Sequence, residues 1–218
     1  SFISGLHQLL EHKHDLYPSL GHLSGCQQSH SVFFSRYSKI MGLTGTMGSS
    51  IEREELNHFY ELDTFDTPLH IQGTRQAWPS VLSKTSASWL EDIANECLDV
   101  SKYKRPVLVI MEAIMNTREL FSILSSNNNS QASVQLLSGE QDDEAEVVIA
   151  KSGRPSVITV ATNMAGRGAD IRTTKESEAA GGLHVIITFS PSNSRVKGQA
   201  EGRTARQGNR GTFRYIFN

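Results

Sequence analysis

An arginine between two glycines, followed by an aspartate, is the part of this sequence best suited to hold a phosphorylated ligand. An apolar run leads directly into Thr162–Ile171, a segment that contains Gly166, Arg167, Gly168 and Asp170. Glycine lets a backbone approach a ligand closely, and arginine pairs with phosphate oxygens. A carboxylate accepts hydrogen bonds from a ribose hydroxyl or from the adenine side. We therefore predict a nucleotide-binding loop here.

A second candidate segment, Gln199–Gly208, places Arg203 and Arg206 three residues apart. If a helix forms over 195–206, this spacing puts both guanidinium groups on one face. Such a pair is suited to clamp a transferring phosphoryl group. The structural alternative is that both arginines lie on a solvated surface and make weak salt bridges.

Short β-branched runs that alternate with helical stretches must position these two segments. The pattern predicts strands at 107–110, 134–137, 157–161, 183–187 and 212–217. It predicts helices at about 85–100, 116–125, 142–152 and 195–206. Continuous apolar strands separated by helices are typical of a parallel sheet covered on both faces, with ligands beyond the carboxyl ends of the strands. We predict an α/β fold.

A helical segment is expected ahead of this sheet. Aromatic and apolar residues from Phe33 to Met41 recur at spacings of three and four, which predicts an amphipathic helix. The glycine-punctuated loop Gly42–Thr46 would end that helix.

Composition excludes several classes of protein. The 218 residues carry 21 basic and 23 acidic side chains, a net charge of −2, so no bulk basic footprint for nucleic acid is present. Cys26 and Cys97 lie far apart, which excludes a disulfide framework and fits a reducing compartment. No apolar run approaches the roughly 20 residues of a membrane span. We expect a soluble, cytoplasmic protein, with peripheral attachment to a membrane as the alternative.

The motifs resemble those of known motors. Gln199-x-x-Gly202-Arg203-x-x-Arg206 resembles motif VI of superfamily 2 helicase-type motors. More narrowly, the chain resembles SecA, the preprotein translocase ATPases, in three ordered stretches, Ala161–Ile171, Gly181–Ile186 and Gly202–Gly208. The resemblance runs essentially from end to end, since further stretches agree in order and approximate spacing: Gly5–Lys13, Gly42–Thr46 and Tyr60–Thr64.

The resemblance implies a RecA-like, P-loop NTPase-type fold and an ATPase that moves unfolded polypeptide. ATP or ADP with Mg²⁺ would lie between two RecA-like domains. Residues 1–60 would be the tail of the first motor domain, and residues 61–218 the second, helicase C-terminal-like domain. The expected partners are that first motor domain, the unfolded polypeptide and a membrane translocon.

The resemblance also implies roles for particular residues. Asp170 would contact the nucleotide, with Arg167 near the phosphates in the loop formed by Gly166 and Gly168. Arg203 and Arg206 would stabilise charge on the γ-phosphoryl group, with Gln199 ordering the cleft. The loop Thr44, Gly45 and Thr46 would couple nucleotide state to domain movement.

The chain lacks a phosphate cradle of its own, because no Gly-x-x-x-x-Gly-Lys-Ser/Thr occurs in it. We therefore expect no ATP turnover by this chain alone, and we expect the Mg²⁺ ligands to come mainly from the first domain. The chain also departs from the SecA pattern at Asn209-Arg210, where Asp-Pro is usual, and at Trp89, where lysine is common.

Two alternatives to a SecA-like motor stay open. The same motor fold serves nucleic-acid helicases, although the near-neutral charge makes nucleic acid the weaker expectation as a partner. A non-catalytic scaffold that kept the fold is the other. A zinc site is not expected, because the eight histidines match no ligand spacing.

Overall fold

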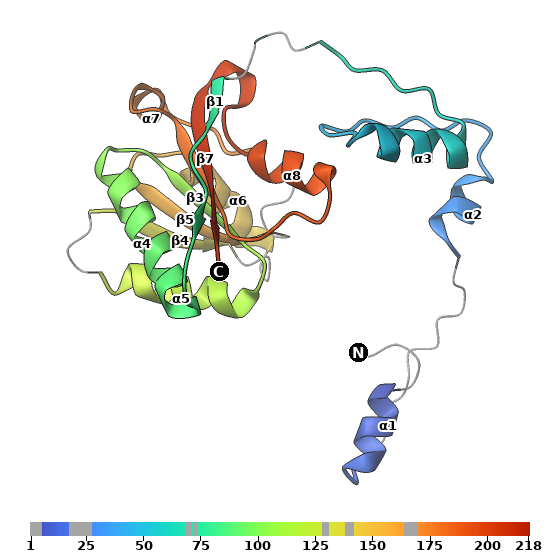
Figure 1. Ribbon diagram of the computed structural model, residues 1–218, viewed down its shortest axis with the longest axis horizontal. Coiled ribbons are helices and arrows are strands. Elements are labelled where there is room, and N and C mark those ends of the chain that lie inside the picture. Colours follow the sequence, from blue (N-terminus) through green and yellow to red (C-terminus); the bar gives the residue numbers. More distant parts are fainter. Residues whose placement is uncertain are drawn as a thin grey trace. The chain divides into compact units, whose positions relative to one another are not determined.

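The computed structural model describes residues 6–17, 28–68, 71, 74–127, 131–137, 142–163 and 170–218 (Figure 1). The chain divides into two compact units. The first comprises residues 1–42 and 55–63, and the second comprises residues 43–54 and 64–218. The predicted nucleotide-loop residues Gly166, Arg167 and Gly168 lie outside the described residues, as does Cys26.

The second unit is built on a parallel sheet with the strand order β1-β7-β6-β3-β5-β4. Its strands are β1 (Thr74–Ala77), β3 (Val107–Met111), β4 (Ser133–Leu137), β5 (Val157–Thr162), β6 (Leu183–Ile187) and β7 (Arg210–Phe217). The short strand β2 (Val81–Leu82) also pairs with β7. Every described pairing is parallel, so the predicted α/β fold is confirmed.

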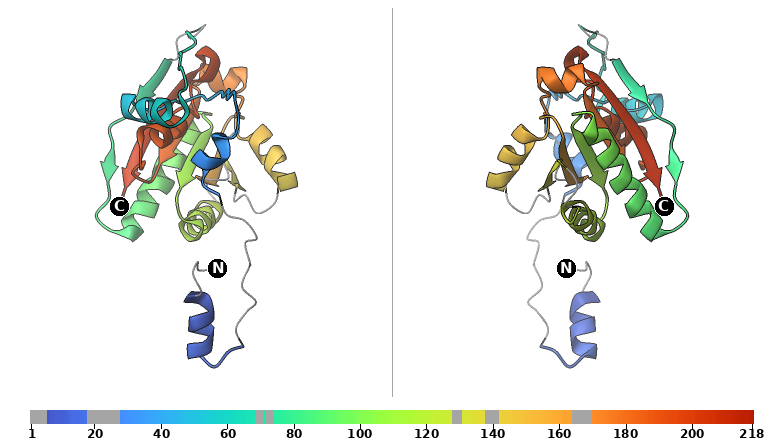
Figure 2. Two further views of the ribbon diagram at one scale, coloured as in Figure 1. Left: turned by 90° about the vertical axis from the view of Figure 1, so that its right-hand side faces the viewer. Right: turned by 90° about the vertical axis from the view of Figure 1, so that its left-hand side faces the viewer.

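Helices cover both faces of this sheet. On one face, α4 (Ser86–Lys102) and α5 (Ile114–Ser125) pack over Val107, Val109 and Ile158. On the other, α6 (Asp142–Lys151) and α8 (Ser194–Glu201) pack over alternate residues of the same strands. Figure 2 shows α4 and α6 on opposite sides of the sheet. The short helix α7 (Lys175–Ala179) precedes β6.

The five strands predicted from apolar runs are all present. Three of them, β3, β5 and β6, are buried along their whole length, which explains their continuous apolar sequences. The edge strands β1 and β2 were not predicted. All four side chains of β1 are exposed, so its sequence, Thr-Arg-Gln-Ala, has no apolar alternation to reveal it.

The first unit contains α1 (Leu6–Lys13), α2 (His30–Phe34) and the last part of α3 (Ser50–Tyr60). The predicted amphipathic helix from Phe33 to Met41 is wrong, since α2 ends at Phe34. No residue of α2 is buried, and a short helix draws most of its stability from packing its apolar face. Tyr37 instead lies beyond the helix, with its ring 5.5 Å from that of Phe33.

Candidate functional site

The helix that was predicted over 195–206 stops early, and this changes how the two arginines are held. Helix α8 ends at Glu201, and Gly202 follows as its C-cap. Ala205 then adopts a left-handed backbone, with φ +55°, before a short 3₁₀ turn at Arg206–Gly208. Arg203 and Arg206 therefore do not share a helix face. Their positions depend on the turn that leads from α8 back to β7.

Arg203 lies over the sheet. It is 7% exposed and, with Gln199, borders a small gap above Ile110 and Asn163, at the carboxyl ends of β3 and β5. Burial fixes the direction of its side chain, because a long side chain held against packed strands has few rotamers left.

Arg206 and Asp170 form an ion pair. Nη1 of Arg206 donates to Oδ1 of Asp170 over 3.0 Å, and Nε donates to the carbonyl of Gly202 over 2.9 Å. The Arg206 guanidinium lowers the pKa of the Asp170 carboxyl, with a smaller effect from Arg172. Two residues chosen from separate motifs for contact with nucleotide thus meet in space.

The backbone that follows Asp170 is anchored at two points. The next residue, Ile171, is buried in the same apolar cluster as Ala200 of α8. Further along, the Glu178 carboxylate accepts the hydroxyl of Thr173 and, at 2.8 Å, the backbone N–H of Arg210. The Asp170 segment is therefore tied to the start of β7, directly after the arginine turn. Asp170 is not a helix cap, because the N-cap of α7 is Thr174.

A surface groove of about 560 Å³ collects most of the predicted site residues that the structure describes. Its lining comes from the 45–46 loop, from β1, from α8 and from the arginine turn: Gly45, Thr46, Arg75, Gly198, Gln199, Gly202, Arg203 and Arg206. Three guanidinium groups on one groove supply many fixed donors, which is a donor set suited to phosphate oxygens. The groove therefore fits a polyphosphate.

Arg75 is the groove residue that sequence reasoning missed. Its guanidinium lies 3.8 Å from the Glu201 carboxylate and 5.7 Å from the centre of the Phe213 ring. An isolated arginine in an exposed strand gives no signal in the sequence, so only the pairing of β1 with β7 reveals it.

The residues of the loop 44–46, for which coupling is predicted, contribute unequally to the groove. Gly45 and Thr46 line the groove, whereas the Thr44 hydroxyl turns back on the chain, donating to the Thr46 carbonyl over 3.0 Å and accepting from the Thr46 N–H over 3.3 Å. In the part of the chain that the structure describes, the Thr46 hydroxyl oxygen is buried and has no hydrogen-bond partner. A buried hydroxyl without a partner is costly. The Thr46 hydroxyl is thus an unsatisfied polar group beside the groove.

Comparison with known proteins agrees with this geometry. Residues 72–179 match the family model described as the SecA P-loop domain. The whole chain is 34% identical to "Protein translocase subunit SecA 2" of Bordetella avium and 33% identical to "Protein translocase subunit SecA" of Syntrophus aciditrophicus. The chain belongs to the SecA family. It spans 32% of the first relative and 25% of the second, so it corresponds to about a third or less of their length.

Two solved structures share the fold of this SecA-family chain. One is yeast Prp28, a DEAD-box splicing factor, with a TM-score of 0.52 and 16% identity over 78% of this chain and 36% of that one. The other is Dbp5 of S. cerevisiae bound to RNA and ADP BeF3, with a TM-score of 0.54 and 17% identity over 77% of this chain and 42% of that one. The sheet is thus of the RecA-like helicase-domain type.

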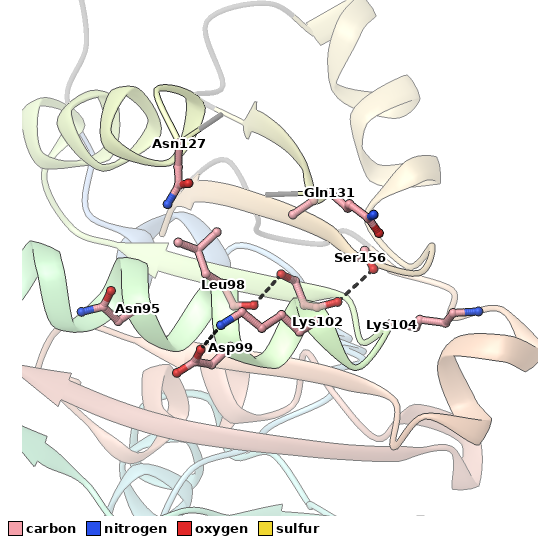
Figure 3. Close-up of a pocket in the computed structure, with 10 residues that line it drawn as sticks. Asn95, Leu98, Asp99, Lys102, Lys104, Asn127, Gln131 and Ser156 are labelled. Carbon is pink, nitrogen blue, oxygen red and sulfur yellow. Dashed lines mark hydrogen bonds and ion pairs between the residues drawn. The ribbon is translucent and has the colours of Figure 1, made fainter. Parts of the chain in front are cut away.

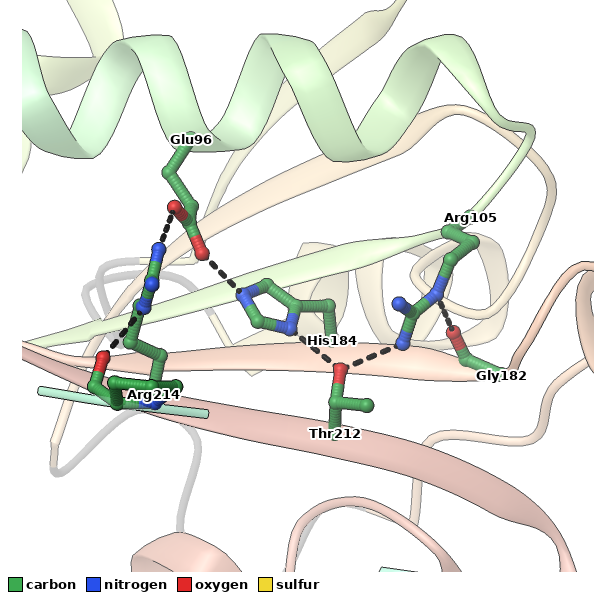
Figure 4. A network of polar contacts seen from close by, with 7 residues as sticks. Glu96, Arg105, Gly182, His184, Thr212 and Arg214 are labelled. Atoms are coloured by element: carbon green, nitrogen blue, oxygen red, sulfur yellow. Dashed lines mark hydrogen bonds and ion pairs between the residues drawn. The ribbon is translucent and has the colours of Figure 1, made fainter. Parts of the chain in front are cut away.

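The His184 of the SecA-like Gly-Gly-Leu-His stretch belongs to a buried polar network (Figure 4). Arg105 Nη2 donates to Thr212 Oγ1 over 2.6 Å, and the Thr212 hydroxyl shares a second hydrogen bond with His184 Nδ1, also at 2.6 Å, in which the hydroxyl donates when the ring carries its proton on Nε2. His184 Nε2–H then donates to Glu96 Oε1 over 3.2 Å, and Arg214 pairs with the other Glu96 oxygen. These partners fit the neutral ring, which carries one proton.

Burial explains the titration of this network. His184 is fully buried, and loss of hydration lowers its pKa despite the opposing effect of Glu96. Burial works against the Glu96 carboxylate, but His184 and Arg214 outweigh it and hold the pKa of Glu96 below its ordinary value. Trp78 covers the network, with its ring 4.6 Å from that of His184. The hydrogen bonds of the network thus run between protein groups, and they join helix α4 to strands β6 and β7.

A second hollow, of about 620 Å³, lies where β4 and β5 begin (Figure 3). It contains none of the predicted site residues. Its two lysines are already paired, Lys102 with Asp99 at 2.7 Å and Lys104 with Glu176 at 2.8 Å. Basic groups are paired in both hollows, so the groove is the better candidate for a nucleotide site because, of the two, it alone collects the predicted site residues.

Within the described ranges, no group of three or more His, Cys, Asp or Glu side chains is placed to hold a metal ion. Among the same residues, no helix has the length and apolar character needed to cross a bilayer.

Proposed function

We propose that this chain is the second motor domain, with the tail of the first, of an ATP-driven motor that moves unfolded polypeptide. The observation that carries the proposal is the groove: Gly45, Thr46, Gln199, Arg203 and Arg206, chosen from two distant motifs, line one hollow. Similarity to SecA translocases over the whole chain supports the identity of the motor.

In this proposal, the nucleotide is held mainly by a first motor domain, which supplies the phosphate cradle and the Mg²⁺ ligands. Mg²⁺ would neutralise charge on the phosphates. Arg206 and Arg203 would donate to the γ-phosphoryl oxygens, and Asp170 would accept from the nucleotide, with Gly166, Arg167 and Gly168 lining the approach. Arginine fingers stabilise the charge that develops in phosphoryl transfer, and they act only on phosphates that are already held.

The ion pair between Arg206 and Asp170 gives this arrangement a resting state. With no phosphate in the groove, the guanidinium is partly neutralised by the carboxylate 3.0 Å away. When a phosphate enters, Arg206 would turn to it and Asp170 would become an acceptor for the nucleotide. The exchange replaces one exposed ion pair, which contributes little to stability, with contacts to the ligand.

Gln199 would order the cleft, and the loop Thr44, Gly45 and Thr46 would transmit nucleotide state to movement of the two domains. The same proposal includes an unfolded polypeptide as the substrate and a membrane translocon as a partner. It also places the protein in the cytoplasm or at the periphery of a membrane. Similarity to the SecA relatives supports these parts.

The test is ATP turnover by a chimera in which residues 1–218 of this chain replace the matching stretch of the Bordetella avium relative. Turnover is titrated with an unfolded polypeptide and, in parallel, with single-stranded RNA, and Arg206→Ala serves as the inactive control. We expect stimulation by polypeptide that is lost in the variant. Stimulation by RNA alone would replace the proposal with a helicase. An assembled chimera that binds ATP but does not hydrolyse it would indicate a scaffold.

A further inference from the structure

The segment that follows the coupling loop runs along helix α8. The methyl group of Thr46 faces Gly198, where an added Cβ would lie 3.0 Å from it. Gly48, with φ +94°, comes so close to Arg195 that an added Cβ would lie 2.9 Å from its Cγ. Glu52 reaches Ser194, the first residue of α8. As the segment proceeds from 46 to 52, its contacts move from the second turn of α8 back to its start.

Glu52 joins two helix N-termini through one oxygen. Its Oε2 accepts the backbone N–H of Ser49 over 2.6 Å and the Ser49 hydroxyl over 2.8 Å, so the Glu52 side chain caps the start of α3 as in one half of a capping box. The same oxygen accepts the hydroxyl of Ser194 over 2.6 Å. These donors, the Ser194 hydroxyl first among them, lower the pKa of Glu52 to about 2, so the carboxylate is charged at neutral pH.

We propose that Glu52 is a positioning residue that fastens the coupling loop to α8 by accepting the Ser194 hydroxyl. Helix α8 carries Gln199 and leads into the turn with Arg203 and Arg206. A loop fastened to this helix keeps Thr46 against the groove and makes loop and arginines move as one piece. The importance of this for ATP hydrolysis rests on the proposed function, but the contact itself does not.

A disulfide trap measures the docked loop without any nucleotide. The Cβ added at Gly198 would lie 3.7 Å from the Cβ of Thr46, close to the spacing that a disulfide requires. The double variant Thr46→Cys/Gly198→Cys is made in the 218-residue chain with Cys26→Ser; Cys97 stays, because it is fully buried and burial raises the pKa of its thiol. The rate of cross-linking by oxidised glutathione reports the docked fraction.

Four variants in this background test the proposal. Ser194→Ala removes the bond to α8 and leaves the cap of α3 intact; Ser194→Thr keeps the hydroxyl. Glu52→Ala removes the bond to Ser194 together with the two bonds to Ser49, and Glu54→Ala, which removes an exposed carboxylate on the same helix, is the control. We expect Ser194→Ala and Glu52→Ala to slow cross-linking about twofold to tenfold, the effect of one lost hydrogen bond. Ser194→Thr and Glu54→Ala should keep the original rate.

Two results would overturn the proposal. If Ser194→Ala cross-links at the original rate, Glu52 serves α3 alone, even where Glu52→Ala is slow. If Ser194→Thr is as slow as Ser194→Ala, the hydroxyl is not the link. Since the readout needs no ATP, a chain that passes this test and still fails to support turnover in the chimera contradicts the proposed function and leaves the role of Glu52 standing.

Discussion

Two arginine-containing clusters in this domain use the same chemistry for different ends. In the His184 network, each hydrogen bond drawn in Figure 4 joins two protein groups. The Trp78 ring packs against His184, 4.6 Å from its ring. In the groove, Arg206 is 33% exposed and pairs with a carboxylate that is 41% exposed. In the network, His184 is fully buried and the Glu96 and Arg214 side chains are 13% and 22% exposed. A fully paired, mostly buried network stabilises a fold, and a more exposed pair can exchange its partner for a ligand at small cost.

The surroundings of the two clusters predict a structural role for one and a functional role for the other, and membership of a sequence motif does not. Both His184 and Arg206 belong to the SecA-like stretches, yet the structure separates them by their surroundings. Substitutions in the network should therefore change the free energy of unfolding, and substitutions in the groove should change the handling of nucleotide.

The largest expected effect is on catalysis. In the chimera with the Bordetella avium relative, Arg206→Ala should lower kcat for ATP by about 10³-fold or more, because the γ-phosphoryl charge loses an arginine. Arg172→Ala is the matched control, since Arg172 also pairs with Asp170 but is 88% exposed and lies outside the groove lining. Equal losses in both variants would place the effect on Asp170 rather than on an arginine finger.

The next effect is on stability. Glu96→Ala removes the acceptor of the buried His184 N–H and of Arg214 Nη1, so the free energy of unfolding should fall by about 3 kcal/mol. Urea denaturation of the 218-residue chain measures this. Arg206→Ala should change the same quantity by less than about 1 kcal/mol, as expected for an exposed pair. A reversed order would break the division between the clusters.

Acid should weaken the network in a defined range. The folded pKa of His184 is lowered, so below about pH 6.5 the unfolded chain takes up a proton that the folded chain refuses. The free energy of unfolding should fall as the pH drops through this range, by at most about 1.4 kcal/mol per pH unit for one proton. Below about pH 4.5, the lowered pKa of Glu96 adds to the loss in the same direction.

His184→Gln isolates this contribution, since glutamine stays neutral. The variant should lose much of the pH dependence between about pH 5 and 6.5, and His58→Gln, at an exposed position, should keep it. Identical pH profiles for the two variants would show that His184 does not titrate in the network.

The smallest effect concerns the groove residue that the sequence did not reveal. Arg75→Ala should weaken nucleotide binding by the chimera about threefold to tenfold with little change in kcat, the loss of one charge-assisted hydrogen bond shared with water. Equilibrium binding of a fluorescent ATP analogue measures it. A loss as large as that of Arg206→Ala in kcat would make Arg75 a third arginine finger.

Hydrophobic pattern was enough to predict the central strands, because β3, β5 and β6 are buried on both faces and read as continuous apolar runs. The pattern did not predict two elements that border the groove, the end of helix α8 and strand β1. The helix predicted over 195–206 ended at Glu201, since Gly202 and the left-handed Ala205 break it. Strand β1 stayed hidden because its side chains are exposed.

Polar contacts across the fold were also beyond pattern. Glu96 lies on the amphipathic helix α4 and His184 within the apolar run of β6. Neither stretch of sequence shows that the two side chains form a hydrogen bond. Motif resemblance chose Gly45, Thr46, Gln199, Arg203 and Arg206, and these five residues line one groove; their roles toward nucleotide stay a prediction. It gave no sign of Arg75, which lies outside those motifs.

The most direct measurement of the central claim compares ATP turnover by the 218-residue chain alone with turnover by the chimera, at the same concentration and with Mg²⁺. We expect no hydrolysis above background by the chain alone, because it has no Gly-x-x-x-x-Gly-Lys-Ser/Thr cradle, and hydrolysis by the chimera that requires Arg206. Turnover by the pure chain, or turnover by the chimera that survives Arg206→Ala, would contradict the account.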